Sequence, residues 1–393
     1  MFSFKYTPRL KSDYILVLPS WYPSEVSPFN GDFNQRFVEA VSLKVPQIVL
    51  YVVGKPNIPQ TYFTLTVKGN LKTYLVYYPL KKNILGKIYA KINYFITQAK
   101  FLKLILKQNG LPKLTQVYVF WMAGIAAFTL KKIYSIPYII TEHWTGFYKN
   151  SPSDMYKNNF LIRYIFKMIL KSANHFIAVA YKLKNRILEW SPKAMVTVIP
   201  NVVDTSIFYL QPTTDKKHSF RFVHASTMRI QKNSIGLLNG FENAVKENNN
   251  LELLLVGHVP QNIEDKINAS VLLQQKVTCL GEVPYTTVKD IMLTGDAYIM
   301  FSRYENLPCV ILEALCCGLP VITTDAGGCA EVISPSNGIV VQNENEMELT
   351  QAILEMVNNR ASYNSFTISQ DATKLFNYKT VSAQIVNVYE NIA

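Results

Sequence analysis

Short apolar runs rich in β-branched residues alternate with amphipathic, helix-like patterns along the whole chain. This alternation predicts a parallel α/β architecture, because each buried strand is followed by a helix that can cover the sheet. The predicted strands of the first half are 15–18, 48–53, 73–78, 117–120, 138–141, 176–179 and 196–199, with helices such as 33–42, 160–171 and 182–189 between them. The predicted strands of the second half are 221–225, 252–256, 277–280, 297–301, 320–323 and 338–341.

Two domains are expected, because 393 residues are too many for one ordinary hydrophobic core. The boundary is predicted just after the strand 196–199, where Ile-Pro-Asn-Val-Val-Asp leads towards the polar, proline-containing stretch 211–219. Such a stretch is typical of an interdomain linker. The predicted domains are therefore residues 1–203 and 204–377, and a helical pattern over 381–392 closes the chain.

Composition narrows the class of protein. Hydrophobic residues make up 49% of the chain, which is ample for burial, yet no apolar run reaches the roughly 18 uncharged residues of a membrane-spanning helix. The N-terminus lacks a signal-peptide pattern, since its apolar run over 14–19 is short and no small-residue cleavage site follows. All five cysteines lie in the second half. Their odd number and apolar neighbours favour buried, reduced thiols in the cytoplasm over a metal site.

Positive charge is concentrated in the first half of the chain. Residues 1–200 contain 27 Lys and Arg against 7 Asp and Glu, whereas residues 201–393 contain 13 against 20. This asymmetry predicts an anionic partner for the first half, and no recognisable nucleic-acid-binding motif accompanies it. Lys81 and Lys82 precede a helix-like run over 87–107 in which lysines alternate with Ile, Phe and Leu. Such a helix fits either an anionic membrane surface or an ordinary surface position with its apolar stripe on the sheet.

Two glutamates, Glu305 and Glu313, lie in the most informative segment, 299–333. Glu305 follows the predicted strand 297–301, Pro308 suits the first turn of a helix, and Glu313 falls in the second turn. Their apolar neighbours predict burial, and a buried carboxylate needs a partner. Carboxylates accept hydrogen bonds from sugar hydroxyls, and a helix N-terminus favours phosphate. The segment therefore indicates a nucleotide-sugar site, whereas the pair alone would indicate a solvated helix face.

The same segment resembles the signature of retaining glycosyltransferases of family 4, which have the GT-B fold. The resemblance rests on the Glu–seven residues–Glu spacing, the strand Gly-Leu-Pro-Val-Ile over 318–322, and the pair Gly327 and Gly328. It implies an α/β protein of two Rossmann-like domains whose parallel sheets face an interdomain cleft. It also implies that the terminal helix, 378–393, crosses back to the first domain.

The resemblance further assigns donor-binding roles in the second half. Glu305 would hold the hydroxyls of the donor sugar and Glu313 those of the ribose, with help from the backbone N–H groups of Asn306 and Leu307. Lys232 would neutralise the donor diphosphate. Arg229 lies two positions after the place of the family's diphosphate-binding arginine. Gly257 resembles the family's glycine at a strand end near the nucleotide. Taken without the resemblance, these are surface charges and a turn glycine.

Candidate residues in the first half follow the predicted strands. His143 resembles the active-site histidine of the family, next to donor sugar and acceptor, and its alternative is a core or capping histidine. Glu142 would tune the charge of His143 or bind acceptor. Gly31 resembles the glycine of a loop over the diphosphate and is otherwise a turn glycine. Trp21 and Tyr22 either shape an acceptor pocket or pack their own loop.

The sequence therefore predicts a retaining glycosyltransferase in which Glu305, His143 and Lys232 are the candidate catalytic residues. It would act without metal or cofactor, because no clustered Asp-x-Asp motif is present. It would transfer a sugar from a nucleotide-sugar to a saccharide acceptor, expected to be linked to a lipid, in bacterial-type cell-surface glycan assembly. The expected location is the cytoplasm or the inner face of the membrane. Two alternatives are a catalytically inactive, membrane-associated sugar-nucleotide-binding protein and a GT-B nucleotide-sugar epimerase.

Overall fold

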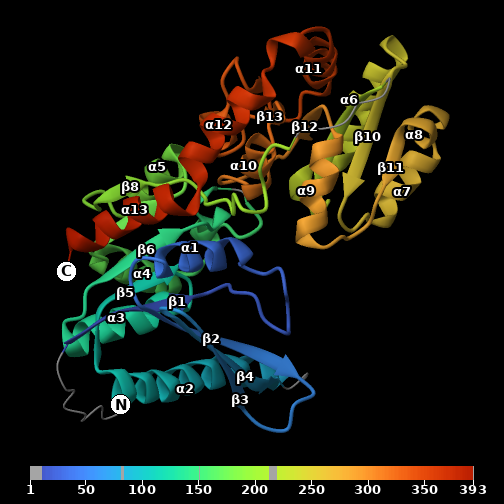
Figure 1. Cartoon of the computed structure of the whole chain (residues 1–393). Coiled ribbons are helices and arrows are strands. Elements are labelled where there is room, and N and C mark those ends of the chain that lie inside the picture. Colours follow the sequence, from blue (N-terminus) through green and yellow to red (C-terminus); the bar gives the residue numbers. More distant parts are fainter. Residues whose placement is uncertain (1–10, 81–83, 150, 212–218, 393) are drawn as a thin grey trace. The chain divides into compact units, whose positions relative to one another are not determined.

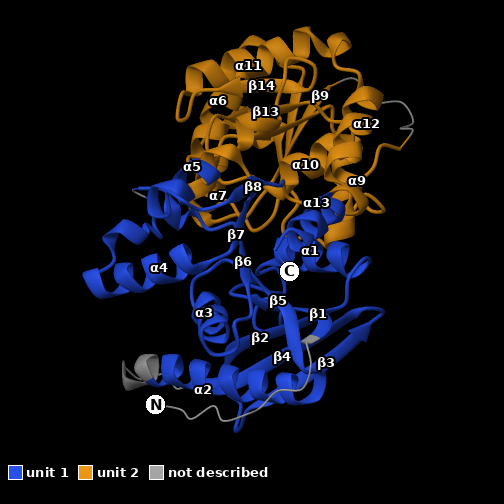
Figure 2. Cartoon of the chain, turned by 90° about the vertical axis from the view of Figure 1, so that its left-hand side faces the viewer, with its two compact units in different colours: residues 1–179, 184–199, 381–393 blue, residues 180–183, 200–380 orange. Residues whose placement is uncertain are grey.

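A computed structural model describes residues 11–80, 84–149, 151–211 and 219–392. The chain divides into two compact units (Figure 2): unit 1 holds residues 1–179, 184–199 and 381–393, and unit 2 holds residues 180–183 and 200–380. The predicted division after Val203 differs from this one by a few residues. Lys81, Lys82 and most of the predicted linker lie outside the described residues.

Unit 1 is built on an eight-stranded sheet of order β3-β4-β2-β1-β5-β6-β7-β8, in which only the edge strand β3 is antiparallel (Figure 1). The strands are β1 (Lys11–Pro19), β2 (Gln47–Pro56), β3 (Tyr62–Lys68), β4 (Leu71–Leu80), β5 (Leu111–Tyr118), β6 (Tyr138–Glu142), β7 (His175–Ala178) and β8 (Val196–Val198). The helical segments of this part of the chain are α1 (Asp32–Ser42), α2 (Ile84–Asn109), α3 (Ala123–Tyr134), η1 (Thr145–Phe147), η2 (Met155–Lys157), α4 (Phe160–Ser172) and α5 (Tyr181–Trp190). Most of the last helix, α13 (Tyr378–Glu390), also belongs to unit 1.

The sequence analysis predicted strand β4, as 73–78, but missed its partner in the edge hairpin, β3. Its signal is present, because Phe63, Leu65 and Val67 alternate with polar residues and a two-residue Gly-Asn loop follows. The three side chains are 45–59% exposed, so the strand has no continuous buried face to mark it. Phe63 nevertheless packs edge-on against Phe101 of α2, with ring centroids 5.2 Å apart.

Strand β5 begins six residues earlier than predicted and ends two residues earlier. Its polar residues hid its start, although Thr115 and Gln116 are fully buried and the Gln116 amide donates to the Thr141 hydroxyl at 2.9 Å. The strand ends at Tyr118 because Val119 adopts a left-handed φ of 60°. That conformation cannot continue a strand.

Unit 2 is built on a six-stranded, fully parallel sheet of order β11-β10-β9-β12-β13-β14. The strands are β9 (Phe220–Ala225), β10 (Leu251–Val256), β11 (Val277–Cys279), β12 (Ala297–Met300), β13 (Val321–Thr324) and β14 (Gly338–Val341). The helical segments are η3 (Ile230–Lys232), α6 (Ser234–Glu247), α7 (Gln261–Asn268), α8 (Val271–Lys276), α9 (Tyr285–Thr294), α10 (Cys309–Cys316), η4 (Cys329–Val332), α11 (Glu346–Asn358), η5 (Arg360–Ser362) and α12 (Ser365–Phe376).

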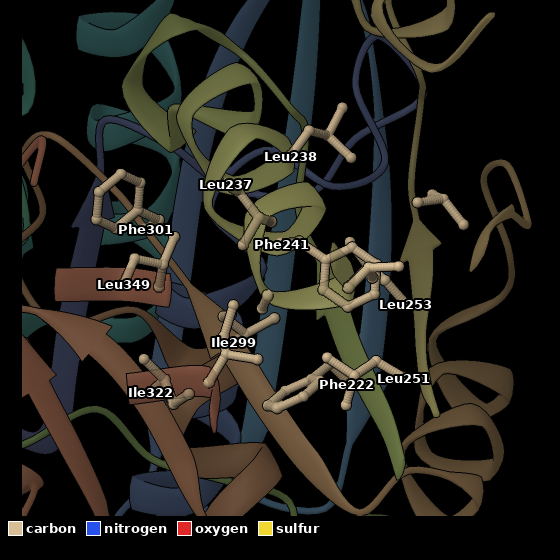
Figure 3. Packing of buried hydrophobic residues seen from close by; sticks show 14 of the residues in the cluster. Phe222, Leu237, Leu238, Phe241, Leu251, Leu253, Ile299, Phe301, Ile322 and Leu349 are labelled. Carbon is tan, nitrogen blue, oxygen red and sulfur yellow. The ribbon is translucent and has the colours of Figure 1, made fainter. Parts of the chain in front are cut away.

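The core of unit 2 lies between one face of its sheet and helices α6 and α11. Figure 3 shows Phe222 and Ile299 of the sheet beneath Leu237 and Phe241 of α6, with Leu349 of α11 beside them. All five side chains are fully buried. This rigid layer fixes where the loops at the carboxyl ends of β9 and β12 emerge.

The prediction of a parallel α/β architecture is confirmed, and each sheet has a point where the direction of strand addition reverses. In unit 1 this switch point lies between β1 and β5, and in unit 2 it lies between β9 and β12. Loops at the carboxyl ends of two such strands diverge to opposite faces of the sheet, which leaves a crevice where ligands bind in open α/β folds. The expected burial of the five cysteines holds only in part: Cys316, Cys317 and Cys329 are buried, whereas Cys309 is half-buried and Cys279 is exposed.

Candidate active site

Lys232 and Glu305 meet at the switch point of unit 2. Lys232 ends the loop that follows β9, and Glu305 lies in the loop that follows β12. The Lys232 ammonium donates a hydrogen bond to Oε1 of Glu305 at 2.6 Å, and the two side chains are only 14% and 8% exposed. Each charge therefore compensates the other, as a buried ion requires.

The glycine pair of the motif shapes the loop that carries Glu305. Gly327 has a left-handed φ of 56°, and a Cβ there would lie 1.9 Å from the Glu305 carbonyl oxygen. The Gly328 N–H donates to the Asn306 carbonyl at 2.5 Å, and a Cβ on Gly328 would lie 2.3 Å from the Ala180 Cβ. Only glycine lets these two stretches of backbone approach so closely.

Helix α10 starts directly after this loop and carries Glu313. The predicted position of Pro308 was off by one residue: it is the N-cap, with an extended ψ of 129°, and the helix begins at the next residue. Leu307 is buried and its carbonyl accepts from the Asn201 amide at 2.5 Å. Glu313, in the second turn, is 4% exposed and accepts from the Tyr285 hydroxyl at 2.6 Å. Tyr285, which opens α9, was not singled out by sequence.

A buried histidine beneath the Lys232 loop was also missed. His224 donates through Nδ1 to the Ile299 carbonyl at 2.8 Å, and its Nε2 accepts from the Ser226 hydroxyl at 2.7 Å. Ser226 in turn accepts from the Met228 N–H at 3.0 Å. Burial, with a further contribution from the Lys232 charge, lowers the pKa of His224 to about 4 against the effect of the Ile299 bond. The ring is therefore neutral and ties β12 to the start of the loop.

The two remaining candidates of unit 2 differ in their surroundings. Gly257 follows β10 with φ 122°, and a Cβ there would lie 2.0 Å from the Ser226 carbonyl oxygen, so glycine is required where the two loops touch. Arg229 is exposed, and its carbonyl accepts from the Lys232 N–H at 2.7 Å. The structure thus brings Gly257 to the base of the Lys232 loop, whereas Arg229 is an exposed residue of that loop.

His143 lies among aromatic rings of unit 1. Its ring centroid is 4.7 Å from that of Phe33, 5.4 Å from that of Phe37 and 6.4 Å from that of Tyr118. Burial lowers the pKa of His143 to about 3. A neutral imidazole at this position can exchange hydrogen bonds but does not supply a positive charge near pH 7.

Glu142 holds together the loops that follow β5 and β6. Its carboxylate accepts from the backbone N–H groups of Phe120 at 3.2 Å, His143 at 2.9 Å and Trp144 at 2.8 Å. Burial raises the pKa of Glu142 to about 7, and the three N–H groups oppose that rise. Both oxygens serve the backbone, so these contacts describe a positioning residue; acceptor binding by Glu142 stays a prediction.

The loop after β1 is shaped by Gly31, the N-cap of α1. Gly31 has φ 75°, and a Cβ there would lie 2.4 Å from the Trp21 carbonyl and 2.7 Å from the Tyr22 nitrogen. Tyr22 is 3% exposed and packs on Tyr51 with ring centroids 6.1 Å apart, so it packs the loop. Trp21 is only partly buried and lines an open pocket.

Two further features concern the described part of the chain as a whole. Residues 11–80, 84–149, 151–211 and 219–392 contain no cluster of three or more His, Cys, Asp or Glu side chains arranged to hold a metal ion. None of the helices described there combines the length and apolarity needed to span a bilayer.

Two family models match the chain in succession. Residues 61–207 match Glycosyltransferase Family 4, and residues 207–370 match Glycosyl transferases group 1. The chain belongs to glycosyltransferase family 4. The predicted family and the GT-B fold are thereby confirmed, since the similar solved structures are GT-B glycosyltransferases as well.

Individual relatives agree with this assignment. The uncharacterized glycosyltransferase MJ1178 of Methanocaldococcus jannaschii is 27% identical over 78% of this chain and 83% of its own. The phosphatidylinositol N-acetylglucosaminyltransferase GPI3 subunit of Saccharomyces cerevisiae is 25% identical over 57% of this chain. The matched part makes up 52% of the GPI3 subunit, so this chain spans about half the length of that relative. Among solved structures, Anabaena HepE in complex with UDP superposes with a TM-score of 0.71 at 16% identity, covering 97% of this chain and 100% of that one. At this low sequence identity, the similarity to HepE shows a shared fold alone.

Proposed function

We propose that this glycosyltransferase takes its sugar from a nucleoside diphosphate sugar bound at the switch point of unit 2. The observation that carries the proposal is the buried pair of Lys232 and Glu305 beside the N-terminus of α10. An ammonium and a helix N-terminus are the groups that stabilise a departing diphosphate without a metal. HepE, of the same fold, was crystallised with UDP.

The contacts suggest how the donor is accommodated. A diphosphate would draw the Lys232 ammonium towards its own oxygens, and Glu305 would then accept hydrogen bonds from the sugar hydroxyls. Glu313, already oriented by Tyr285, would accept from the ribose hydroxyls, which are donors of the same kind. Because the diphosphate then pairs with the ammonium and the hydroxyls donate hydrogen bonds to the carboxylate, neither group is left buried without a partner.

The proposed reaction retains the anomeric configuration. The bond from the anomeric carbon to the phosphate oxygen breaks, the bond to the acceptor oxygen forms on the same face, and the acceptor proton passes to the departing phosphate. Neutral His143 would contribute a hydrogen bond rather than a charge.

The proposed acceptor is a saccharide attached to a lipid, as part of cell-surface glycan assembly. The GPI3 subunit is named for transfer of N-acetylglucosamine to phosphatidylinositol. Helix α2 exposes Tyr89, Ile92 and Ile96 and then the lysines Lys100 and Lys103. An exposed stripe that is first apolar and then basic suits the surface of an anionic membrane, so the protein would act from the cytoplasm at the inner membrane face.

Donor binding and turnover test the proposal. UDP and a panel of nucleotide-sugars are titrated calorimetrically into the wild type, Lys232→Met and the control Lys246→Met, which removes an exposed lysine of α6. Lys232→Met should weaken binding of the diphosphate by about tenfold or more, whereas the control should match the wild type. NMR of the product should show the donor's anomeric configuration, and EDTA should leave the rate unchanged.

Other outcomes separate the alternatives. Donor binding with no transfer to any saccharide would identify an inactive binding protein, and conversion of the donor sugar without an acceptor would identify an epimerase. If no nucleotide-sugar binds and the lysine variants behave alike, the donor site is not at Lys232.

A separate experiment tests the proposed membrane binding. Pelleting of the protein with liposomes should require anionic lipid and decrease with salt.

A further inference from the structure

Unit 1 has an open pocket at its own switch point. The pocket measures about 290 Å³ and is lined chiefly by Trp21, Tyr78, Lys91, Tyr94, Trp121 and Met122. Trp21 follows β1 and Trp121 follows β5, which are the two strands between which the direction of the sheet reverses. This is where an open α/β sheet offers a ligand crevice.

The loop that supplies Trp121 and Met122 is strained. Val119 and Met122 have φ values of 60° and 66°, which cost a branched or bulky residue on the order of 1–3 kcal/mol each. Such strain persists only where neighbouring contacts enforce it, and it concentrates at binding sites.

Two polar side chains, Ser20 and Glu142, hold this loop in place. The Ser20 hydroxyl donates to the Val119 carbonyl at 2.7 Å and also contacts the Trp121 carbonyl. The Glu142 carboxylate accepts from the Phe120 N–H at 3.2 Å. Two polar side chains from other parts of unit 1 therefore hold the loop in the conformation that places Trp121 and Met122 at the pocket.

The residues that line the pocket indicate the chemical class of its ligand. Aromatic faces pack against the C–H face of a sugar ring, and the single lysine at the rim, Lys91, supplies a positive charge for an anionic substituent. The volume lies at the low end of the roughly 300–1,000 Å³ of small-molecule pockets, which suits one sugar residue. Tyr94 is held in place by the Gln98 amide, which donates to its hydroxyl at 2.9 Å.

We propose that this pocket binds one sugar residue of the acceptor through the faces of Trp21 and Trp121, and that this residue carries a phosphate or carboxylate which pairs with Lys91. The inference rests on the proposed transferase function, because it names the chemistry of the acceptor. It makes the enzyme selective for anionic glycans or glycosyl phosphates over neutral saccharides.

Ligand-observed NMR tests the proposal with hexose 1-phosphates, hexuronic acids, methyl hexosides, inorganic phosphate and an alkyl phosphate. The anionic sugars should bind the wild type more tightly than either the neutral glycosides or phosphate alone. Lys91→Gln should weaken the anionic sugars by about tenfold and leave the neutral glycosides unchanged, and Lys91→Arg should restore binding. Trp21→Ala should weaken both classes. Lys107→Gln, which removes an exposed lysine of the same helix outside the pocket, serves as the control.

Three results would overturn the inference. They are equal effects of Lys91→Gln and Lys107→Gln, the absence of saturable binding by every anionic sugar, and equal binding of the alkyl phosphate, which would assign the pocket to a lipid. Titration with UDP in the same samples keeps the two proposals apart. If UDP binds the wild type and Lys91→Gln equally while the sugars fail, only the acceptor inference is lost.

Discussion

Replacing Gly327 by alanine tests whether the glycine pair holds the acidic loop in its working position. The new Cβ would lie 1.9 Å from the Glu305 carbonyl oxygen, whereas real Cβ contacts essentially never fall below 3.0 Å, so the loop must move by about 1 Å. A misplacement of about 1 Å can cost about 10²-fold in rate. The left-handed φ of 56° adds roughly 1–2 kcal/mol of backbone strain. We therefore expect a loss of about two orders of magnitude in transfer rate with a modest loss of stability.

The control is Gly69→Ala in the β3–β4 turn. Gly69 has a similar φ of 54°, but a Cβ there meets no atom within 4 Å. It should show the same backbone strain as a lower Tm, with the transfer rate and UDP affinity of the wild type. Both variants are measured by calorimetry and by single-turnover transfer. A Gly327→Ala enzyme with wild-type rate and donor affinity would refute the idea that this contact positions Glu305.

Three further outcomes follow from the buried polar groups. Lys232→Met should destabilise the protein by about 3–5 kcal/mol, because Glu305 is left buried without its cation; adding Glu305→Gln should recover most of that loss in denaturant unfolding, and additive effects would contradict the pairing. Glu142→Ala leaves three backbone N–H groups without their acceptor and should cost at least about 3 kcal/mol in the same assay. His224 stays neutral until about pH 4 while the unfolded chain takes up its proton near pH 6.5. The contribution of His224 to stability should therefore be full above pH 6.5 and fall by about 3 kcal/mol towards pH 4, and the profile of His224→Gln should lack this contribution.

Much of the fold was predictable because its strands are buried on both faces. Strands β12 and β13 are buried throughout, and β14 was predicted with its observed bounds. Prediction failed where burial and pattern disagree. Strand β5 carries buried Thr115 and Gln116, whose hydrogen bonds cannot be inferred from order along the chain, and β3 is exposed at the edge.

In the candidate site, too, some residues could be predicted from the sequence and others could not. The spacing of Glu305 and Glu313 follows from local geometry, since a loop and little more than one helical turn separate them. Tyr285 and His224 left no comparable signal, because each acts through a partner that lies far away in sequence.

The sequence by itself determined the family, the alternation of strands and helices, and the residue types that suit a diphosphate and sugar hydroxyls. These depend on local periodicity and on short motifs. Only the tertiary structure decided that Lys232 and Glu305, 73 residues apart, form one ion pair, that Glu142 serves the backbone of two loops, and that Trp21 and Trp121 line one pocket. The physical reason is that parallel strands bring distant loops to one edge of a sheet, and which loops become neighbours is set by strand order, which local pattern does not encode.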